Sequence, residues 1–263
     1  MAATDQTATT GATTPSRIAG AFARAKAEGR TALMPFVTAG YPTLTMSAEW
    51  ILALIRGGAD LIEIGVPFSD PLADGTTVQH TSEVALANGT TLSDCLALVD
   101  RLRREHAVET PFMLMGYYNP ILQYGPERFA ADCAAVGVDG VIVPDLPTEE
   151  SDELLAACRA HGRDLVFLIA PTSTDRRIAD VAARASGFIY CVSLTGVTGA
   201  RQTLPALEAY LGRVRGQTDL PLAIGFGIST PEHVRQVGAV ADGAIVASAL
   251  INHLDRLPAA AQP

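Results

Sequence analysis

A glutamate interrupts one of the most apolar runs of the sequence, residues 61–66. In a strand, side chains alternate, so Leu61, Glu63 and Gly65 would share one face and the two intervening isoleucines the other. The isoleucines suit a helix layer, which leaves Glu63 pointing inward. A buried carboxylate is costly unless it is paired or its pKa is raised, and a raised pKa suits a general acid or base. A structural ion pair is the alternative.

A second carboxylate, Asp74, follows within a segment rich in Pro, Gly and Asp, residues 65–75. This composition is typical of a shaped loop rather than of a packed core. Asp74 is therefore a candidate partner for Glu63 in catalysis. Asp74 and Asp70 could equally be turn or cap residues.

Small residues follow three later apolar runs and suit a phosphate group. Gly225 and Gly227 follow one run, and Ala247-Ser248 opens a predicted helix after another. Backbone N–H groups at such places bind phosphate. The segment 195–200 could close as a lid. Its small residues include Thr195, Gly196, Thr198 and Gly199. Each cluster alone is more often a tight turn, but the combination favours a phosphate site.

Two absences narrow the chemistry. The only lysine is Lys26, which precedes the first apolar run, so no lysine is placed to form a Schiff base. The five histidines are dispersed without HxH or HxxxH spacing, so no metal site is expected. Any aldol-type cleavage would therefore depend on carboxylates and on an electron sink within the substrate.

Eight short apolar runs must position these residues. They are residues 33–37, 61–65, 112–116, 140–143, 165–169, 188–192, 222–225 and 244–246. Each is followed by apolar residues at helical spacing, which predicts a single α/β domain, a (β/α)8 TIM barrel. An open doubly wound sheet is disfavoured because no GxGxxG follows the first run. A weak internal repeat around Asp60, Asp139 and Asp242, each leading into a strand, also supports the barrel.

The predicted barrel spans residues 16–257, with an extra helix at 17–29 that closes its bottom. Residues 1–15 are expected to be a disordered tail and 258–263 a C-terminal tail. The first segment is rich in Ala and Thr and lacks the basic start and apolar run of a signal peptide, so a cytoplasmic protein is expected.

Composition excludes several classes of protein. The net charge of -9 argues against a nucleic-acid or anionic membrane surface. No apolar run is long enough to cross a bilayer. The four cysteines lie far apart without a CxxC pair and are expected to be reduced core residues.

The run LIEIGVPFSDPLADG, residues 61–75, closely resembles the signature of the tryptophan synthase alpha subunit family. The likeness extends from Met34 to Ser248. Further similar stretches are MPFVTAG at 34–40, GYYNP at 116–120, VPDLP at 143–147, TGVTG at 195–199 and GFGIS at 225–229.

The resemblance implies retro-aldol cleavage of indole-3-glycerol phosphate to indole and glyceraldehyde 3-phosphate, without metal or organic cofactor. Glu63 would protonate indole C3 and take the proton of the glycerol hydroxyl. Asp74 would accept the indole N–H and stabilise the positive charge on the ring. Tyr190 matches a family tyrosine near the glutamate.

The resemblance also implies the surroundings of the substrate. The indole pocket would be lined by Phe36, Val78, Met115 and Tyr117. Gly199, Gly227 and Ser248 match phosphate-binding positions. The loop after the second strand and the loop near Asn119 would face a beta subunit that carries pyridoxal phosphate, in an alpha2beta2 complex, and closure of the lid would be coupled to that partner.

Two departures from the family pattern concern the loops. Thr76 replaces a usual proline after Asp74-Gly75 and could loosen that loop. Ala247 replaces a usual glycine, which puts phosphate affinity in doubt if that glycine needs a positive φ or close approach. The alternatives are a stand-alone lyase that releases indole and a catalytically silent regulatory subunit.

Overall fold

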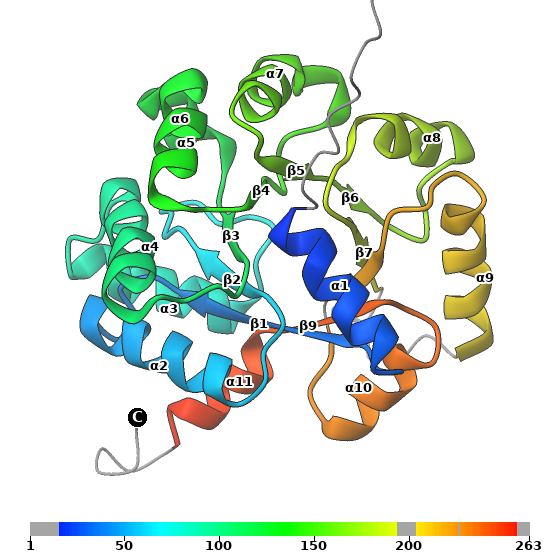
Figure 1. Ribbon diagram of the computed structural model, residues 1–263, viewed down its shortest axis with the longest axis horizontal. Helices are drawn as coiled ribbons and strands as arrows, with labels where there is room; N and C mark the ends of the chain where they lie inside the picture. Colours follow the sequence, from blue (N-terminus) through cyan, green and yellow to red (C-terminus); the bar gives the residue numbers. More distant parts are fainter. Residues whose placement is uncertain (1–15, 194–203, 226, 257–263) are drawn as a thin grey trace, which may run out of the picture.

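The computed structural model describes residues 16–193, 204–225 and 227–256. Within these ranges the strands are all parallel, and helices surround them (Figure 1). The strands are β1 (Ala32–Thr38), β2 (Ile62–Gly65), β3 (Phe112–Met115), β4 (Gly140–Ile142), β5 (Asp164–Val166), β6 (Leu168–Ile169), β7 (Ile189–Val192), β8 (Leu222–Gly225) and β9 (Gly243–Val246). Their order is β5-β4-β3-β2-β1-β9-β8-β7-β6.

The sheet closes into a barrel through the segment that contains β5 and β6. Only Phe167 separates these two strands; β5 pairs with β4, whereas β6 pairs with β7. The backbone N–H of Tyr190 donates to the Phe167 carbonyl at 3.1 Å. The fifth predicted strand, 165–169, is thus one segment, interrupted where its pairing changes from one neighbour to the other. The predicted (β/α)8 barrel is confirmed.

The helices form the outer layer and alternate with the strands. They are α1 (Arg17–Ala27), α2 (Leu44–Arg56), α3 (Thr76–Ala87), α4 (Leu92–His106), α5 (Tyr118–Tyr124), α6 (Pro126–Val136), α7 (Asp152–Ala160), α8 (Asp175–Arg184), α9 (Leu204–Arg215), α10 (Pro231–Gly238) and α11 (Ser248–Leu254), with a short 3-10 helix at Thr148–Glu150. Threonine caps begin several of them, among which Thr91 forms a capping box with Asp94. Among the described residues, none of the helices combines the length and the apolar character that a membrane span requires.

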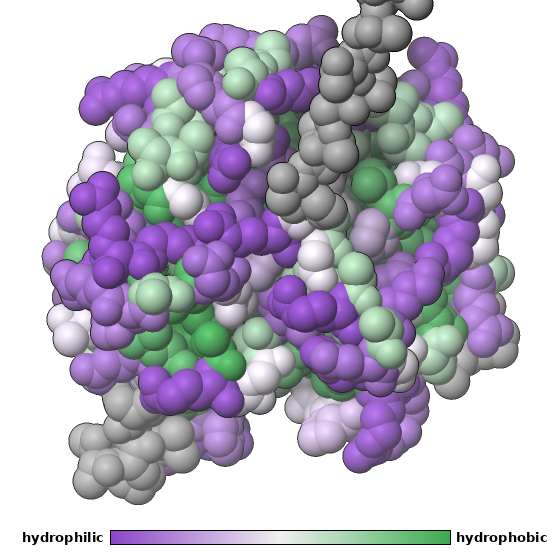
Figure 2. Space-filling view, in the orientation of Figure 1, coloured by the Kyte–Doolittle hydropathy of each residue, from purple (hydrophilic) through white to green (hydrophobic). Residues whose placement is uncertain are grey.

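Helix α1 covers the N-terminal ends of the strands, as predicted (Figure 1). Its residues Ile18, Phe22 and Ala25 are buried, and the ring of Phe22 lies 5.7 Å from that of Phe188. On this face hydrophilic residues predominate, and hydrophobic ones are seen mainly between the helices (Figure 2). All four cysteines are buried and free, which confirms the prediction for them.

The three aspartates of the internal repeat fasten adjacent strands at this same end. The backbone N–H of each donates to the carbonyl of a residue near the start of the neighbouring strand, at 2.8–2.9 Å. The carboxylate accepts the N–H of that same residue, also at 2.8–2.9 Å. For Asp60, Asp139 and Asp242 these residues are Leu33, Phe112 and Leu222 respectively. The repeated aspartates therefore fix the register between neighbouring strands.

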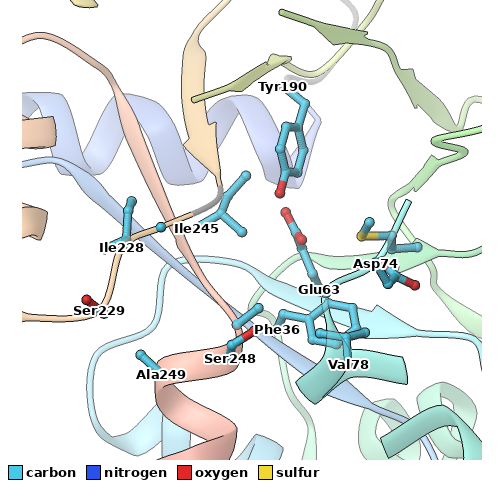
Figure 3. A pocket seen from close by; sticks show the side chains of 14 residues that line it. Phe36, Glu63, Asp74, Val78, Tyr190, Ile228, Ser229, Ile245, Ser248 and Ala249 are labelled. Carbon is cyan, nitrogen blue, oxygen red and sulfur yellow. The ribbon is translucent and has the colours of Figure 1, made fainter. Parts of the chain in front are cut away.

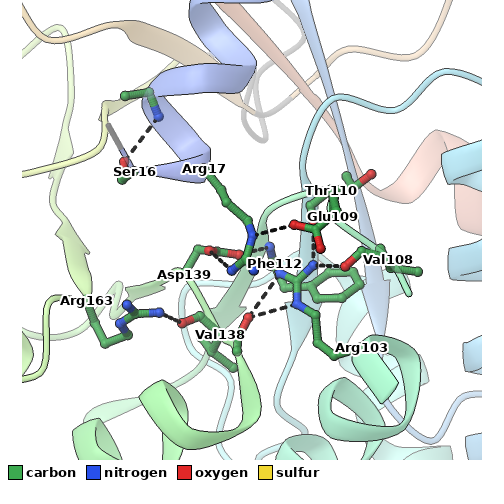
Figure 4. Close-up of polar contacts among 12 residues, drawn as sticks. Ser16, Arg17, Arg103, Val108, Glu109, Thr110, Phe112, Val138, Asp139 and Arg163 are labelled. Carbon is green, nitrogen blue, oxygen red and sulfur yellow. Dashed lines mark hydrogen bonds and ion pairs between the residues drawn. The ribbon is translucent and has the colours of Figure 1, made fainter. Parts of the chain in front are cut away.

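Each of these carboxylates also pairs with arginine. Asp139 accepts from Arg103 at 2.7 Å and from Arg17 of α1 at 3.1 Å (Figure 4). Asp60 pairs with Arg30, and Asp242 pairs with Arg215 at 2.9 Å. The charges of these three carboxylates are thus compensated by ion pairs and backbone N–H groups.

Candidate active site

A cavity with about 710 Å³ of empty space, its mouth included, opens at the other end of the barrel. Its walls come from the C-terminal halves of strands and from the loops after them, which is where barrel enzymes carry their catalytic groups. The lining residues are Phe36, Glu63, Asp74, Gly75, Val78, Met115, Tyr190, Gly227, Ile228, Ser229, Ile245, Ala247, Ser248 and Ala249.

Glu63 lies inside the barrel, on the face that strand alternation predicts. In β2 it pairs with Phe36 of β1 and Met113 of β3, and its exposed fraction is 0%. Among the described residues, neither carboxyl oxygen has a hydrogen-bond partner. Loss of solvation raises the pKa of Glu63 to about 8. The carboxyl is therefore mainly protonated at neutral pH and able to donate a proton.

Tyr190 faces Glu63 from β7 on the opposite wall (Figure 3). It is buried, and desolvation, with further contributions from Glu63 and Asp74, raises the pKa of its phenol well above the usual value. The group is therefore a neutral hydroxyl.

Gly225 makes room for this tyrosine. A Cβ added there would lie 2.1 Å from the Tyr190 hydroxyl oxygen, and Gly225 is not among the residues that line the cavity. Gly225 thus lies beside the tyrosine and outside the described lining, and its assignment to a phosphate site stays a prediction. The sequence shows that a glycine ends β8. It does not show that the Tyr190 ring of the neighbouring strand β7 lies over that glycine.

Asp74 lies in the loop between β2 and α3 and is partly buried at the cavity wall. Desolvation raises the pKa of Asp74 to about 6, and a hydrogen bond with the Tyr117 hydroxyl opposes this rise. At neutral pH Asp74 is therefore mainly ionised while Glu63 is mainly protonated. The site therefore contains one protonated and one ionised carboxyl group.

The loop of Asp74 is fastened at several points. The Ala73 N–H donates to the Tyr117 hydroxyl at 2.9 Å, and Gln79 Nε2 donates to the Asp74 carbonyl at 2.9 Å. The Phe68 ring stacks on Tyr117 with centroids 5.2 Å apart. Helix α3 begins at Thr76. Threonine in place of the family's proline therefore leaves this loop anchored.

The apolar wall contains three of the predicted pocket residues. Phe36, Val78 and Met115 line the main cavity. Tyr117 instead lines a smaller adjoining cavity of about 260 Å³, which shares these three residues and Asp74 with the main one. The structure thus brings all four residues to one end of the barrel.

Several lining residues were not predicted: Gly75, Ile228, Ser229, Ile245 and Ala249. Gly75 lies in the motif at 61–75, and Ile228 and Ser229 lie in the motif at 225–229. These motifs could have indicated the three residues as part of the cavity lining. Ile245 shares a strand face with Gly243, where an added Cβ would meet Met34 and Phe22 inside the barrel. Alternation along that strand could therefore have placed Ile245 inward.

The remaining wall suits an anion. Gly227 has a φ of 77°, which favours glycine, and Ser248 begins α11. Ala247 has a φ of −116°, so a side chain there requires no left-handed backbone. The described lining includes no lysine or arginine, so N–H and hydroxyl groups are the available donors. Thr195, Gly196, Thr198 and Gly199 lie outside the described residues.

No group of three or more His, Cys, Asp or Glu in the described ranges is arranged to hold a metal ion. The titratable groups at the cavity are instead two carboxyl groups and a tyrosine in apolar surroundings, all with raised pKa values.

Comparison with known proteins identifies the family. The sequence model described as "Tryptophan synthase alpha chain" matches residues 22–262. The chain belongs to the tryptophan synthase alpha chain family. It is 59% identical over 244 residues to the alpha chain of Roseiflexus sp. (strain RS-1), covering 92% of this chain and 93% of that protein. It is 56% identical over 244 residues to the alpha chain of Chloroflexus aurantiacus, covering 92% and 91%.

Solved structures of tryptophan synthase alpha chains share the fold. The chain aligns with tryptophan synthase subunit alpha of Legionella pneumophila at a TM-score of 0.85 and 39% identity, covering 92% of this chain and 90% of that one. It aligns with a chain of Mycobacterium tuberculosis tryptophan synthase at a TM-score of 0.85 and 39% identity, covering 92% of each. The family resemblance in the sequence is thus confirmed.

Proposed function

We propose that this chain is a carbon–carbon lyase of tryptophan biosynthesis that cleaves indole-3-glycerol phosphate to indole and glyceraldehyde 3-phosphate. Membership of the tryptophan synthase alpha chain family supports this reaction. The observation that carries the chemistry is Glu63, a fully buried carboxyl with a raised pKa at the wall of an apolar cavity that also contains Asp74.

Glu63 makes both proton transfers, and Asp74 stabilises the charge that forms between them. Glu63 donates its proton to indole C3, which places a positive charge on the ring, and Asp74 stabilises that charge by accepting the indole N–H. Glu63 then removes the proton of the glycerol hydroxyl next to the ring. As the carbonyl of the aldehyde forms, the electrons of the carbon–carbon bond return to the indole ring. Glu63 ends the cycle protonated, as it began.

Tyr190 supports the intermediate state of Glu63. Its hydroxyl faces the carboxyl, and its raised pKa keeps it protonated (Figure 3). A neutral hydroxyl can donate a hydrogen bond to Glu63 while that residue is ionised between the two transfers. This lowers the free energy of a charge that has no arginine or lysine beside it in the described cavity lining.

The substrate would lie with its ring against Phe36, Val78 and Met115 and near Tyr117. Its phosphate would accept hydrogen bonds from Gly227 and Ser248 and from the first turn of α11, with Gly199 as a further donor. Lid closure by Thr195, Gly196 and Thr198 stays a prediction.

The protonated indole ring acts as the electron sink, so this chain would need no metal and no organic cofactor. The family implies a beta subunit as partner, and we expect an alpha2beta2 complex in which only the beta subunit uses pyridoxal phosphate. A cytoplasmic location and tails at residues 1–15 and 258–263 stay predictions.

Indole formation from indole-3-glycerol phosphate tests the proposal. The isolated chain should release indole slowly, and an added tryptophan synthase beta subunit should accelerate it strongly. No indole under either condition would refute the proposed reaction. Equal rates with and without the beta subunit would favour a stand-alone lyase.

A further inference from the structure

Tyr41 joins two segments that are far apart in the sequence. It lies in the loop after β1, and its hydroxyl donates to Asp255 Oδ1 at 2.8 Å, across 214 residues of sequence. Asp255 caps the C-terminal end of α11. Desolvation and the neighbouring Asp255 raise the pKa of Tyr41 to about 12, so the hydroxyl keeps its proton.

The loop that carries Tyr41 is fixed from the side of α2 and α3. Asn88, at the C-cap of α3, donates to the carbonyls of Gly40 at 3.2 Å and Pro42 at 2.7 Å. Ser47 of α2 accepts the Gly40 N–H at 2.9 Å. Backbone movement of this loop is therefore restricted.

The ring of Tyr41 is enclosed as well. It meets Trp50 of α2 and His80 of α3 edge to face, with centroids 5.9 and 6.1 Å away. Only 8% of Tyr41 is exposed. The hydroxyl is thus held at a fixed position relative to α2 and α3.

Helix α11 is a short helix at the other end of this hydrogen bond. It has seven residues, of which Ile251 and Leu254 are buried, and it spans roughly 10 Å. Its first residues, Ser248 and Ala249, line the cavity (Figure 3). Because a short helix moves as a rigid unit, a shift at Asp255 also displaces Ser248.

We propose, on the basis of the proposed function, that the Tyr41–Asp255 hydrogen bond is a positioning contact that braces α11 and so aims its first turn at the substrate phosphate. Tyr41 is not among the residues that line the cavity. Its effect should therefore fall on phosphate binding and not on proton transfer.

The test uses the full chain with Tyr41→Phe, with Asp255→Ala and with both substitutions. Each single variant should raise KM for indole-3-glycerol phosphate and Kd for glycerol phosphate by roughly three- to tenfold, the range of one lost hydrogen bond. The kcat and the Kd for indole, which has no phosphate, should change less than twofold. The double variant should be no worse than either single one, because both remove the same contact.

A matched control removes a tyrosine–aspartate hydrogen bond elsewhere. Tyr124 of α5 donates to Asp132 of α6 at 2.6 Å, and neither residue lines the cavity. Tyr124→Phe should leave the Kd for glycerol phosphate unchanged.

Three outcomes would overturn the brace. These are an unchanged Kd for glycerol phosphate in both single variants, additive losses in the double variant, and an equal loss of indole affinity. Because glycerol phosphate binding is measured without turnover, the result does not depend on the lyase assay. Absence of indole formation by the unmodified chain would instead refute the proposed function.

Discussion

Three aspartates at one end of the barrel and the two carboxyl groups at the cavity have different surroundings. At the N-terminal ends of the strands, Asp60, Asp139 and Asp242 each accept a backbone N–H and pair with arginine. At the C-terminal ends, Glu63 is more deeply buried yet has no hydrogen-bond partner among the described residues. In the described part of the chain, Asp74 has the Tyr117 hydroxyl as a partner and no arginine.

The comparison shows that hydrogen bonds, ion pairs and solvation determine whether a carboxyl group has a structural or a catalytic role. Compensated carboxylates hold strands together, whereas desolvation without compensation raises the pKa and leaves a group that can exchange protons near neutrality. A buried, unpartnered carboxyl costs folding free energy, and such departures from ideal packing are typical of functional sites. Asp60, Asp139 and Asp242 thus hold strands together, whereas Glu63 lies uncompensated at the cavity.

The largest expected effect on activity comes from replacing Glu63. Glu63→Gln keeps the shape but cannot transfer a proton, so kcat/KM for indole formation should fall at least roughly a thousandfold. Circular dichroism and the Tm should show an intact fold. The control is Glu109→Gln, an exposed partner of Arg17 at the other end. Retention of substantial indole release by Glu63→Gln would contradict the assigned role.

The counterpart at the opposite end is Asp139. Asp139→Ala leaves Arg103, which is 10% exposed, without its carboxylate and should lower the free energy of unfolding by about 3 kcal/mol. The kcat of the folded fraction should stay within twofold. Urea unfolding measures the first quantity and indole formation the second. Asp242→Ala breaks a more exposed pair and should cost only about 1 kcal/mol. Equal losses in the two variants would argue against this difference.

Asp74 should show an intermediate effect on the reaction. Asp74→Asn removes the negative charge that stabilises the protonated ring, so kcat should fall roughly a hundredfold. The matched control is Asp70→Asn, since Asp70 is an exposed aspartate of the same loop that accepts from Ser69. In assays of the isolated chain, Asp70→Asn should retain nearly full activity; similar losses in both variants would indicate a loop effect instead.

The smallest expected effect is the change of kcat/KM with pH. Because Asp74 must be ionised and Glu63 protonated, kcat/KM should fall below pH of about 6 and above pH of about 8. A pH-rate profile of the unmodified chain measures both limits. A profile that is flat from pH of about 5 to about 9 would be inconsistent with these assignments.

The free energy of unfolding should also depend on pH through the titration of Glu63. The folded-state pKa of Glu63 is raised, so its protonation favours the folded state: this contribution is present below the ordinary pKa of 4.5 and is lost as pH rises through about 8. Urea unfolding across this window should therefore show a declining component that Glu63→Gln lacks. The sign is opposite to that of a carboxylate stabilised by an ion pair.

The architecture and the inward direction of Glu63 follow from local sequence patterns. Eight apolar runs with helical segments between them require strands covered on both faces, and a two-residue period places Glu63 inside. The motifs also located the loops that meet at the cavity. These inferences succeed because they depend on local pattern, which neighbouring residues in the chain establish.

The folded barrel sets which residues far apart in the sequence meet. It placed the Tyr190 ring over Gly225, fastened the loop of Asp74 to Tyr117, and joined Tyr41 to Asp255. It also gave Ala247 a negative φ, so its side chain requires no left-handed backbone. Such contacts arise from the closure of the barrel and the packing of its loops, and no periodicity within a single segment encodes them.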